Sequence, residues 1–192
     1  KTEMVKATFK TSKDVNDITN AISSANNDLK TAFGLTDEQI NQDDPYMKAT
    51  SDTATVNDAK KSAEMIKAIT QVTTIVKQIT SSLKEAVSTK DLSGSAAEQK
   101  VKRQQAENVV NTSLIFKAVA KTVQQEAKKL RDKGLTVTTD ENIFTGSAKT
   151  GGDLQSMIED VVNKVDEVVE EEGNKASLTA VIDIKNTPSL KI

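Results

Sequence analysis

The chain has 192 residues, of which 36% are hydrophobic and 28% charged, with a formal net charge of -2. It contains no cysteine and no histidine, which excludes thiol chemistry, disulfides, imidazole catalysis and nearly every zinc, copper or haem site. Aromatic residues make up only 3%, so a core must be built from aliphatic side chains, as between packed helices. The length fits one domain with a short appended segment, and no apolar run approaches the roughly 18 residues that cross a bilayer. The first residue is Lys, so we expect a processed chain or an excised segment.

The first fifty residues predict an extended arm, one helix and a connector. Residues 1–10 alternate apolar and polar side chains, which indicates a short strand or extended arm. A helix is predicted from Thr11 and Ser12 to about Ala32. Its inward face is expected at Val15, Ile18, Ile22, Ala25 and Leu29.

Local signals then end that helix and lead into the connector. Gly34 suits a left-handed helix end, and Thr36 with Gln39 forms a capping-box pattern around one short turn. Pro45 restricts the residue before it to extended geometry, so residues 43–50 are expected to connect to the next helix without forming one.

The longest predicted element is one amphipathic helix over residues 51–87, with no Gly or Pro inside it. Its apolar residues recur at steps of three and four, and its length is roughly 50 Å, so it needs packing partners throughout. We expect the centre of the core at the midpoint of this helix, at Ile69, Val72, Ile75 and Val76.

Two further helices follow after a turn at residues 88–95. One is predicted over residues 96–130 with Gly134 beyond its end, and the other over residues 153–170. Between them lie a short β-branched stretch at 135–139, a turn at 140–144 and a glycine-containing loop. The last segment, residues 176–192, fits two patterns: Leu178, Val181 and Ile182 suit a helical turn or two, whereas residues 181–185 alternate like a strand. A second extended arm is expected over residues 181–192.

Charge is distributed unevenly between these last two helices. Residues 97–133 hold nine Lys and Arg against four Asp and Glu, a balance of +5, and residues 153–172 hold one against eight, a balance of -7. The favoured interpretation is that the two helices lie side by side and partly neutralise each other. Nucleic-acid binding is set aside, because the basic stretch lacks the aromatic and arginine interleaving that stacks on bases.

Two motifs with known chemistry are weighed and not adopted. Ser81 and Lys84 match S-x-x-K, and residues 149–151 match K-T-G, as in serine acylases of the penicillin-binding type. That chemistry needs a sheet beside the serine, whereas this chain has hardly any strand pattern. Asp43, Asp44 and Asp52 are oxygen ligands suited to Ca²⁺, but no EF-hand loop pattern accompanies them, so a turn is the favoured interpretation.

The chain contains, in order, a Phe-Gly-Leu turn, an Asp-Asp-Pro connector, a long helix and a Leu-x-Val-Thr loop element before a shorter last helix at 153–168. The residues of this pattern are Phe33, Gly34, Leu35, Asp43, Asp44, Pro45, Asn57, Ala59, Gln71, Val72, Thr73, Thr74, Ile75, Leu135, Val137 and Thr138. Together these segments resemble a helical module of very large secreted bacterial proteins, where it is combined with cadherin-like, immunoglobulin-like or calcium-binding repeats. The resemblance covers residues 11–180 and implies an extracellular role in adhesion, matrix or surface-layer assembly, with no catalytic residues.

These observations predict an all-α antiparallel bundle of about four helices over residues 11–180, with extended arms at residues 1–10 and 181–192. We expect a non-enzymatic structural or interaction module, extracellular or at the cell surface, with no catalytic, cofactor-binding or metal-binding residues. The expected partners are neighbouring domains or identical subunits, with no nucleic acid and no membrane insertion, and calcium is unsupported. The alternative is a free-standing filament or virion subunit that self-associates through its terminal arms. A bundle that binds a small ligand has little support, because ligand pockets usually carry aromatic residues.

Overall fold

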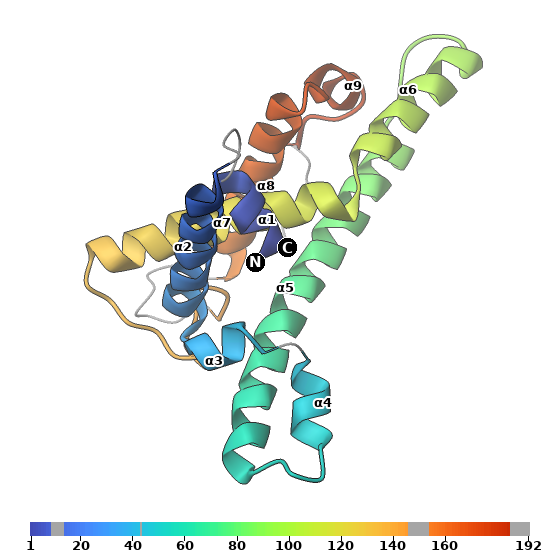
Figure 1. Cartoon of the computed structure of the whole chain (residues 1–192). Helices are drawn as coiled ribbons and strands as arrows, with labels where there is room; N and C mark the ends of the chain where they lie inside the picture. The colour runs from blue at the N-terminus through green and yellow to red at the C-terminus, as the bar shows by residue number, and fades with distance from the viewer. Residues whose placement is uncertain (9–13, 43, 146–153, 185–192) are drawn as a thin grey trace. The chain divides into compact units, whose positions relative to one another are not determined.

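The computed structural model describes residues 1–8, 14–42, 44–145 and 154–184 (Figure 1). The regular structure of these residues is entirely helical, which confirms the all-α class. The helices are α1 (Thr2–Thr8), α2 (Val15–Phe33), α3 (Asp37–Ile40), α4 (Pro45–Thr50), α5 (Val56–Thr89), α6 (Ala96–Val109), α7 (Thr112–Asp132), α8 (Leu154–Glu171) and α9 (Lys175–Thr179). Four of them, α2, α5, α7 and α8, have 18 residues or more, in agreement with the expected four principal helices.

The chain divides into two compact units. The first unit holds Lys1–Thr73 and Val123–Leu154, and the second holds Thr74–Thr122 and Gln155–Ile192. Both α5 and α7 therefore contribute residues to each unit. That residues 11–180 form one domain stays a prediction.

The first unit has a small core around α2 and the segment that follows α7. The rings of Phe33 and Phe144 lie 5.6 Å apart between centroids, and the Ile143 N–H donates to the Ala32 carbonyl oxygen at 3.1 Å. The buried hydrophobic residues of this unit are Met4, Ala21, Ala25, Ala32, Phe33, Leu35, Ile40, Ala68, Val123, Ala127, Leu130, Ile143 and Phe144.

Gly34 ends α2 as the sequence predicts. Its φ is 66°, in the left-handed region, and its N–H donates to the Lys30 carbonyl oxygen at 2.9 Å. A Cβ at this position would lie only 2.6 Å from the backbone of Thr138. Glycine is therefore required both by the backbone conformation and by the loop that packs on this helix end.

The N-terminal extended arm is a wrong prediction for residues 2–8. These residues form α1, which contacts α2, and Met4 is buried. The helix is favoured because it places Met4 in the core and pairs Lys6 with Glu3 one turn away, at 2.9 Å. Gln124, in the first unit's part of α7, also donates to the Met4 carbonyl oxygen at 3.3 Å. Residues 9 and 10 lie outside the described residues.

The connector at residues 43–50 is also corrected. All of it from Pro45 to Thr50 is a helix, α4, which lies beside the start of α5 (Figure 1). The Asp44 carboxylate accepts from the N–H groups of Tyr46 and Met47 at 2.9 and 3.1 Å, and Pro45 occupies the first helical turn, where its missing N–H costs nothing. Lys48 holds α4 to α5 through Asp58 at 3.5 Å.

The second unit has a larger aliphatic core. The helical part of this unit comprises residues 74–89 of α5, all of α6, residues 112–122 of α7, nearly all of α8, and α9. Its fully buried large side chains are Val76, Ile79, Leu83, Val87, Val110, Leu114, Ile115, Val161, Val165 and Leu178. Arg103 of α6 binds the C-terminal end of α5, donating to the carbonyl oxygens of Val87 at 2.8 Å and Ser88 at 2.6 Å and to that of Lys90. Cationic groups are favourable at this end of a helix.

The single helix predicted over residues 96–130 is interrupted. α6 ends at Val109 and α7 begins at Thr112. Val110 is buried with ψ 88°, and the Asn111 side chain accepts from the Leu114 N–H at 2.9 Å, so Asn111 caps a new helix in place of continuing the old one. The predicted pairing of this basic region with the acidic last helix is confirmed where Lys117 and Lys121 of α7 contact Glu172 and Glu171 at the end of α8.

The expected centre of the core is partly wrong. Ile75 and Val76 are buried, but Val72 is only half-buried and Ile69 is 40% exposed. At the other end of the chain, Val181, Ile182 and Ile184 are buried after α9 and none lies in a strand. This corrects the start of the predicted C-terminal arm, while residues 185–192 lie outside the described residues.

Candidate functional site

Three different faces run along α2, and two of them are open to solvent. The face packed into the first unit carries Ala21, Ala25, Asp28 and Ala32, all buried. The second face is a polar cleft, and the third is an exposed hydrophobic row of three residues, called here the apolar flank.

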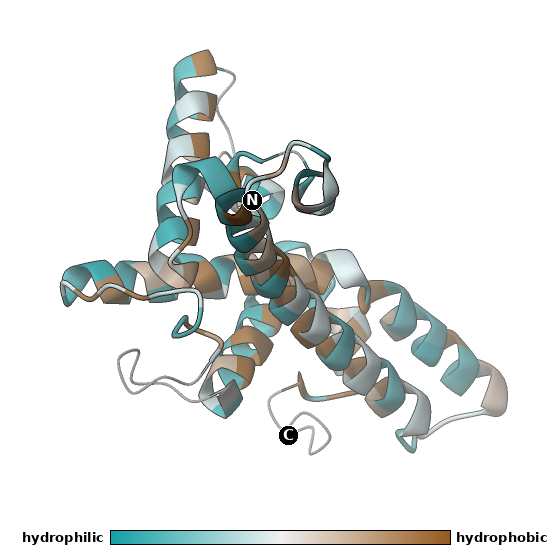
Figure 2. Ribbon diagram, turned by 90° about the horizontal axis from the view of Figure 1, so that it is seen from below, coloured by the Kyte–Doolittle hydropathy of each residue, from teal (hydrophilic) through white to brown (hydrophobic). Residues whose placement is uncertain are grey.

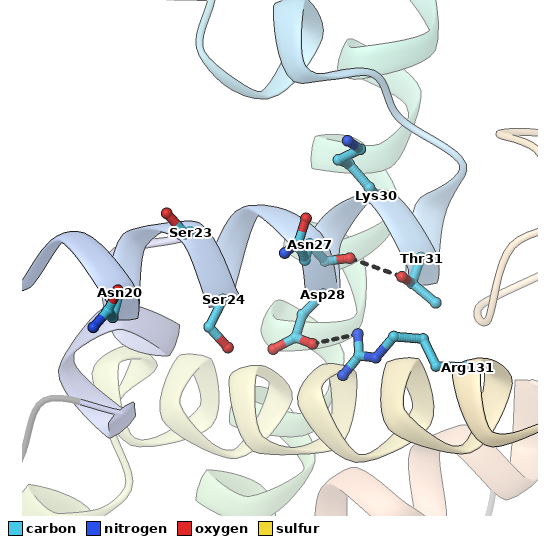
Figure 3. A pocket seen from close by; sticks show the side chains of 8 residues that line it. All are labelled: Asn20, Ser23, Ser24, Asn27, Asp28, Lys30, Thr31 and Arg131. Atoms are coloured by element: carbon cyan, nitrogen blue, oxygen red, sulfur yellow. Dashed lines mark hydrogen bonds and ion pairs between the residues drawn. The ribbon is translucent and has the colours of Figure 1, made fainter. Parts of the chain in front are cut away.

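The polar cleft has a volume of about 520 Å³ and lies along α2 where the end of α7 passes it (Figure 3). Its floor, on the side toward α7, is formed by Asn20, Ser24, Asp28 and Thr31 with Arg131, and its rim by Ser23, Asn27 and Lys30. All eight lining residues are polar or charged, so the cleft offers hydrogen-bonding groups and is lined by no hydrophobic side chain.

An ion pair between a buried carboxylate and an exposed guanidinium forms part of the floor of the cleft. Figure 3 shows Arg131 reaching from α7 to Asp28, whose Oδ1 accepts from the guanidinium at 2.7 Å. The Asp28 side chain is only 5% exposed, whereas that of Arg131 is 44% exposed. Burial raises the pKa of the Asp28 carboxyl above its ordinary value, and the hydrogen bond and charge of Arg131 oppose this rise.

Most other polar side chains of the cleft have no hydrogen-bond partner among the described residues. Within the described part of the chain, the side chains of Asn20, Ser23, Ser24 and Asn27 make no hydrogen bond, and Asp28 Oδ2 makes none. The remaining two have partners: the Thr31 hydroxyl donates to the Asn27 carbonyl oxygen at 2.8 Å, and Lys30 pairs with Asp37 at 2.7 Å. The cleft therefore presents both donors and acceptors beside a fixed charge pair.

The apolar flank consists of Val15, Ile18 and Ile22. Their spacing of three and four residues places them on one line along α2. They are 73%, 38% and 38% exposed. They account for three of the eight exposed large hydrophobic residues in the described part of the chain, and the other five are spread over α4, α5 and α6.

The motifs weighed in the sequence lie elsewhere. Ser81 and Lys84 are both exposed on α5 in the second unit, and residues 149–151 lie outside the described residues. Asp44 caps α4, Asp52 is exposed between α4 and α5, and Asp43 is not among the described residues. In the described ranges no three or more acidic side chains gather as a metal site would require.

Comparison with known proteins adds no relative: no family model matches the chain, and neither a curated protein nor a solved structure matches it. Across the described residues, hydrophobic and hydrophilic positions alternate around the helices (Figure 2), and no helix there combines the length and hydrophobicity needed to span a membrane.

Sequence reasoning missed the polar cleft, although part of its signal was present. Asn20, Ser24 and Thr31 recur at helical spacing and so share one side of α2. Arg131 carried no such signal, because it lies 103 positions after Asp28 and only the folded chain brings them together.

Proposed function

We propose that the chain is a non-enzymatic structural and interaction module of a secreted or cell-surface bacterial assembly, and that the apolar flank of α2 contacts a second copy of the chain. The observation that carries the proposal is the exposed line of Val15, Ile18 and Ile22. The extracellular assignment is supported by the resemblance of residues 11–180 to a helical module of large secreted bacterial proteins.

The size of the flank favours a repeated contact over a single tight one. Burying a Val or Ile side chain completely is worth about 1.5–3 kcal/mol, so covering the exposed parts of these three would contribute about 3 kcal/mol. Association costs at least about 4 kcal/mol in lost freedom, so one such contact is weak. Identical copies held close together in an assembly raise each other's effective concentration, which suits a weak contact made many times.

The alternative of a filament or virion subunit joined through extended arms has less support. Its N-terminal arm is the helix α1, whose Met4 is buried in the first unit and whose backbone is hydrogen-bonded within the helix. Such a segment offers no free strand edge for pairing with another chain.

Sedimentation velocity from about 10 to 500 µM tests the contact. We expect concentration-dependent self-association of the wild type, which Ile18→Ser with Ile22→Ser abolishes. Ile69→Ser is the matched control, because Ile69 is equally exposed but lies on α5. A monomer throughout this range, or equal loss in the control, contradicts the self-contact.

A second measurement tests the cellular placement. In cells that produce the protein naturally, a membrane-impermeant amine reagent should label it before lysis. Labelling only after lysis, with a cytoplasmic protein as reference, would contradict the proposal.

A further inference from the structure

We infer that the polar cleft of α2 binds a neutral polyhydroxylated chain, such as a linear oligosaccharide. This assignment concerns a different face of α2 from the apolar flank and is independent of the proposed function. It follows from the charge, the free hydrogen-bonding groups and the length of the cleft.

The charges of the cleft argue against an ionic ligand. A cation would find the carboxylate of Asp28 already paired with Arg131, and Lys30 at the rim already paired with Asp37, so no unpaired negative charge attracts it. An anion would compete with Asp28 for Arg131, and the buried carboxylate would lose its partner. A hydrophobic ligand finds no hydrophobic side chain among the eight lining residues. A neutral, strongly hydrogen-bonding ligand is the class that remains.

The ion pair itself matches neighbouring hydroxyl groups. Asp28 Oδ2 is an acceptor without a partner among the described residues, and the Arg131 guanidinium has N–H donors beyond the one that binds Oδ1. One hydroxyl can donate to Oδ2 while the next accepts from the guanidinium. Hydrogen bonds to charged groups are stronger than neutral ones, so this pair fixes the position of the ligand.

The rest of the floor extends the site along the helix. Ser24 lies one turn and Asn20 two turns before Asp28 on the same side of α2, and both have free side chains in the described structure. From Asn20 to Thr31 the helix rises about 16 Å, which is long enough for a chain of several sugar rings and much longer than one. Because binding relies on hydrogen bonds without stacking, we expect weak affinity, with Kd of about 1–10 mM.

The experiment is a titration of the isotope-labelled full chain followed by two-dimensional NMR. The probes are maltotetraose and cellotetraose, up to about 50 mM, with choline chloride and sodium sulfate as charged comparisons. We expect saturable shifts of the Asn20 side-chain amide and the Arg131 guanidinium signals with at least one oligosaccharide, and smaller shifts with both salts.

Variants locate the site on the cleft. Asn20→Ala and Ser24→Ala remove exposed side chains without folded-state partners, so both should fold normally by circular dichroism and weaken binding about 5-fold each, the worth of one hydrogen bond. Gln78→Ala, exposed on α5, is the matched control and should leave Kd unchanged. The inference is overturned if neither oligosaccharide shifts these signals, if choline or sulfate shifts them more, or if the two cleft variants bind as tightly as Gln78→Ala.

Discussion

Two isoleucines of α5, ten residues apart, provide a direct test of where the core lies. Ile79 is 1% exposed and Ile69 is 40% exposed, although both fall on the hydrophobic face predicted from the sequence. Changing Ile79 to Ala removes buried methylene groups and leaves a cavity, which should lower the free energy of unfolding by about 3–4 kcal/mol. Ile69→Ala loses only the buried part of the side chain and opens a space that water fills, so its cost should be about 1.5 kcal/mol.

Urea denaturation followed by circular dichroism measures both free energies. Both substitutions gain the same helix propensity from Ala, so the difference of about 2 kcal/mol reports burial alone. Ile69 and Ile79 belong to different compact units, so if two transitions appear, each variant is evaluated in the transition that it shifts. An equal loss in the two variants, or a larger loss for Ile69→Ala, would refute the placement of the core in the second half of α5.

Three further predictions concern a glycine, a cap and a buried acid. Gly34→Ala should lower the free energy of unfolding by at least about 2 kcal/mol in thermal denaturation, because it combines a left-handed φ of 66° with a Cβ 2.6 Å from the Thr138 backbone. The control Gly134→Ala, at a φ of 63° with open space around it, should lower it by only about 1 kcal/mol. Arg103→Ala leaves three carbonyl oxygens at the end of α5 without their donor, so it should cost about 2 kcal/mol and speed amide hydrogen exchange in the last turn of that helix. The pKa of the Asp28 carboxyl is raised in the folded state, chiefly through burial. The folded protein therefore holds this proton more tightly than the unfolded chain does. The contribution of Asp28 to stability consequently falls as the pH rises from the ordinary pKa of 3.8 through the raised pKa. Asp28→Asn removes that dependence, and urea denaturation from about pH 3 to 7 should show the wild type losing stability relative to the variant as the pH rises; parallel curves would contradict it.

Local signals in the sequence predicted local structure well. Gly34 ends α2, Thr36 and Gln39 form the capping box of α3, and residues 90–95 separate α5 from α6. Each depends on interactions within a few residues, so the sequence contains all the information required. The interruption at Asn111 is also local, because the Asn111 side chain caps α7 at Leu114. The sequence nevertheless predicted one continuous helix, because Asn111 lies inside a long helical pattern.

Hydrophobic periodicity was less reliable for deciding which side of a helix is buried. On α5 it predicted one continuous face, yet Ile69 lies in the small first unit and Ile79 in the larger core of the second. Periodicity shows which residues share a face, but the depth of burial depends on how many other elements cover that face. Those elements come from distant parts of the chain, so their number cannot be counted from local spacing.

The orientation of α2 shows why both of its open surfaces escaped prediction. Val15, Ile18, Ile22, Ala25 and Leu29 predicted one inward face, but of these only Ala25 is buried, while Leu29 is half-buried and the other three are exposed. The buried face is the neighbouring one, which carries three alanines, Asp28 and Phe33. Alanine side chains let a helix approach its neighbours closely, and Asp28 can be buried because Arg131 supplies its counter-charge at 2.7 Å. Because α2 packs through this face, Val15, Ile18 and Ile22 are exposed on one side of it and the polar residues of the cleft on the other. The apolar flank and the polar cleft are therefore two consequences of a single choice of packed face, which the Asp28–Arg131 pair helps to fix.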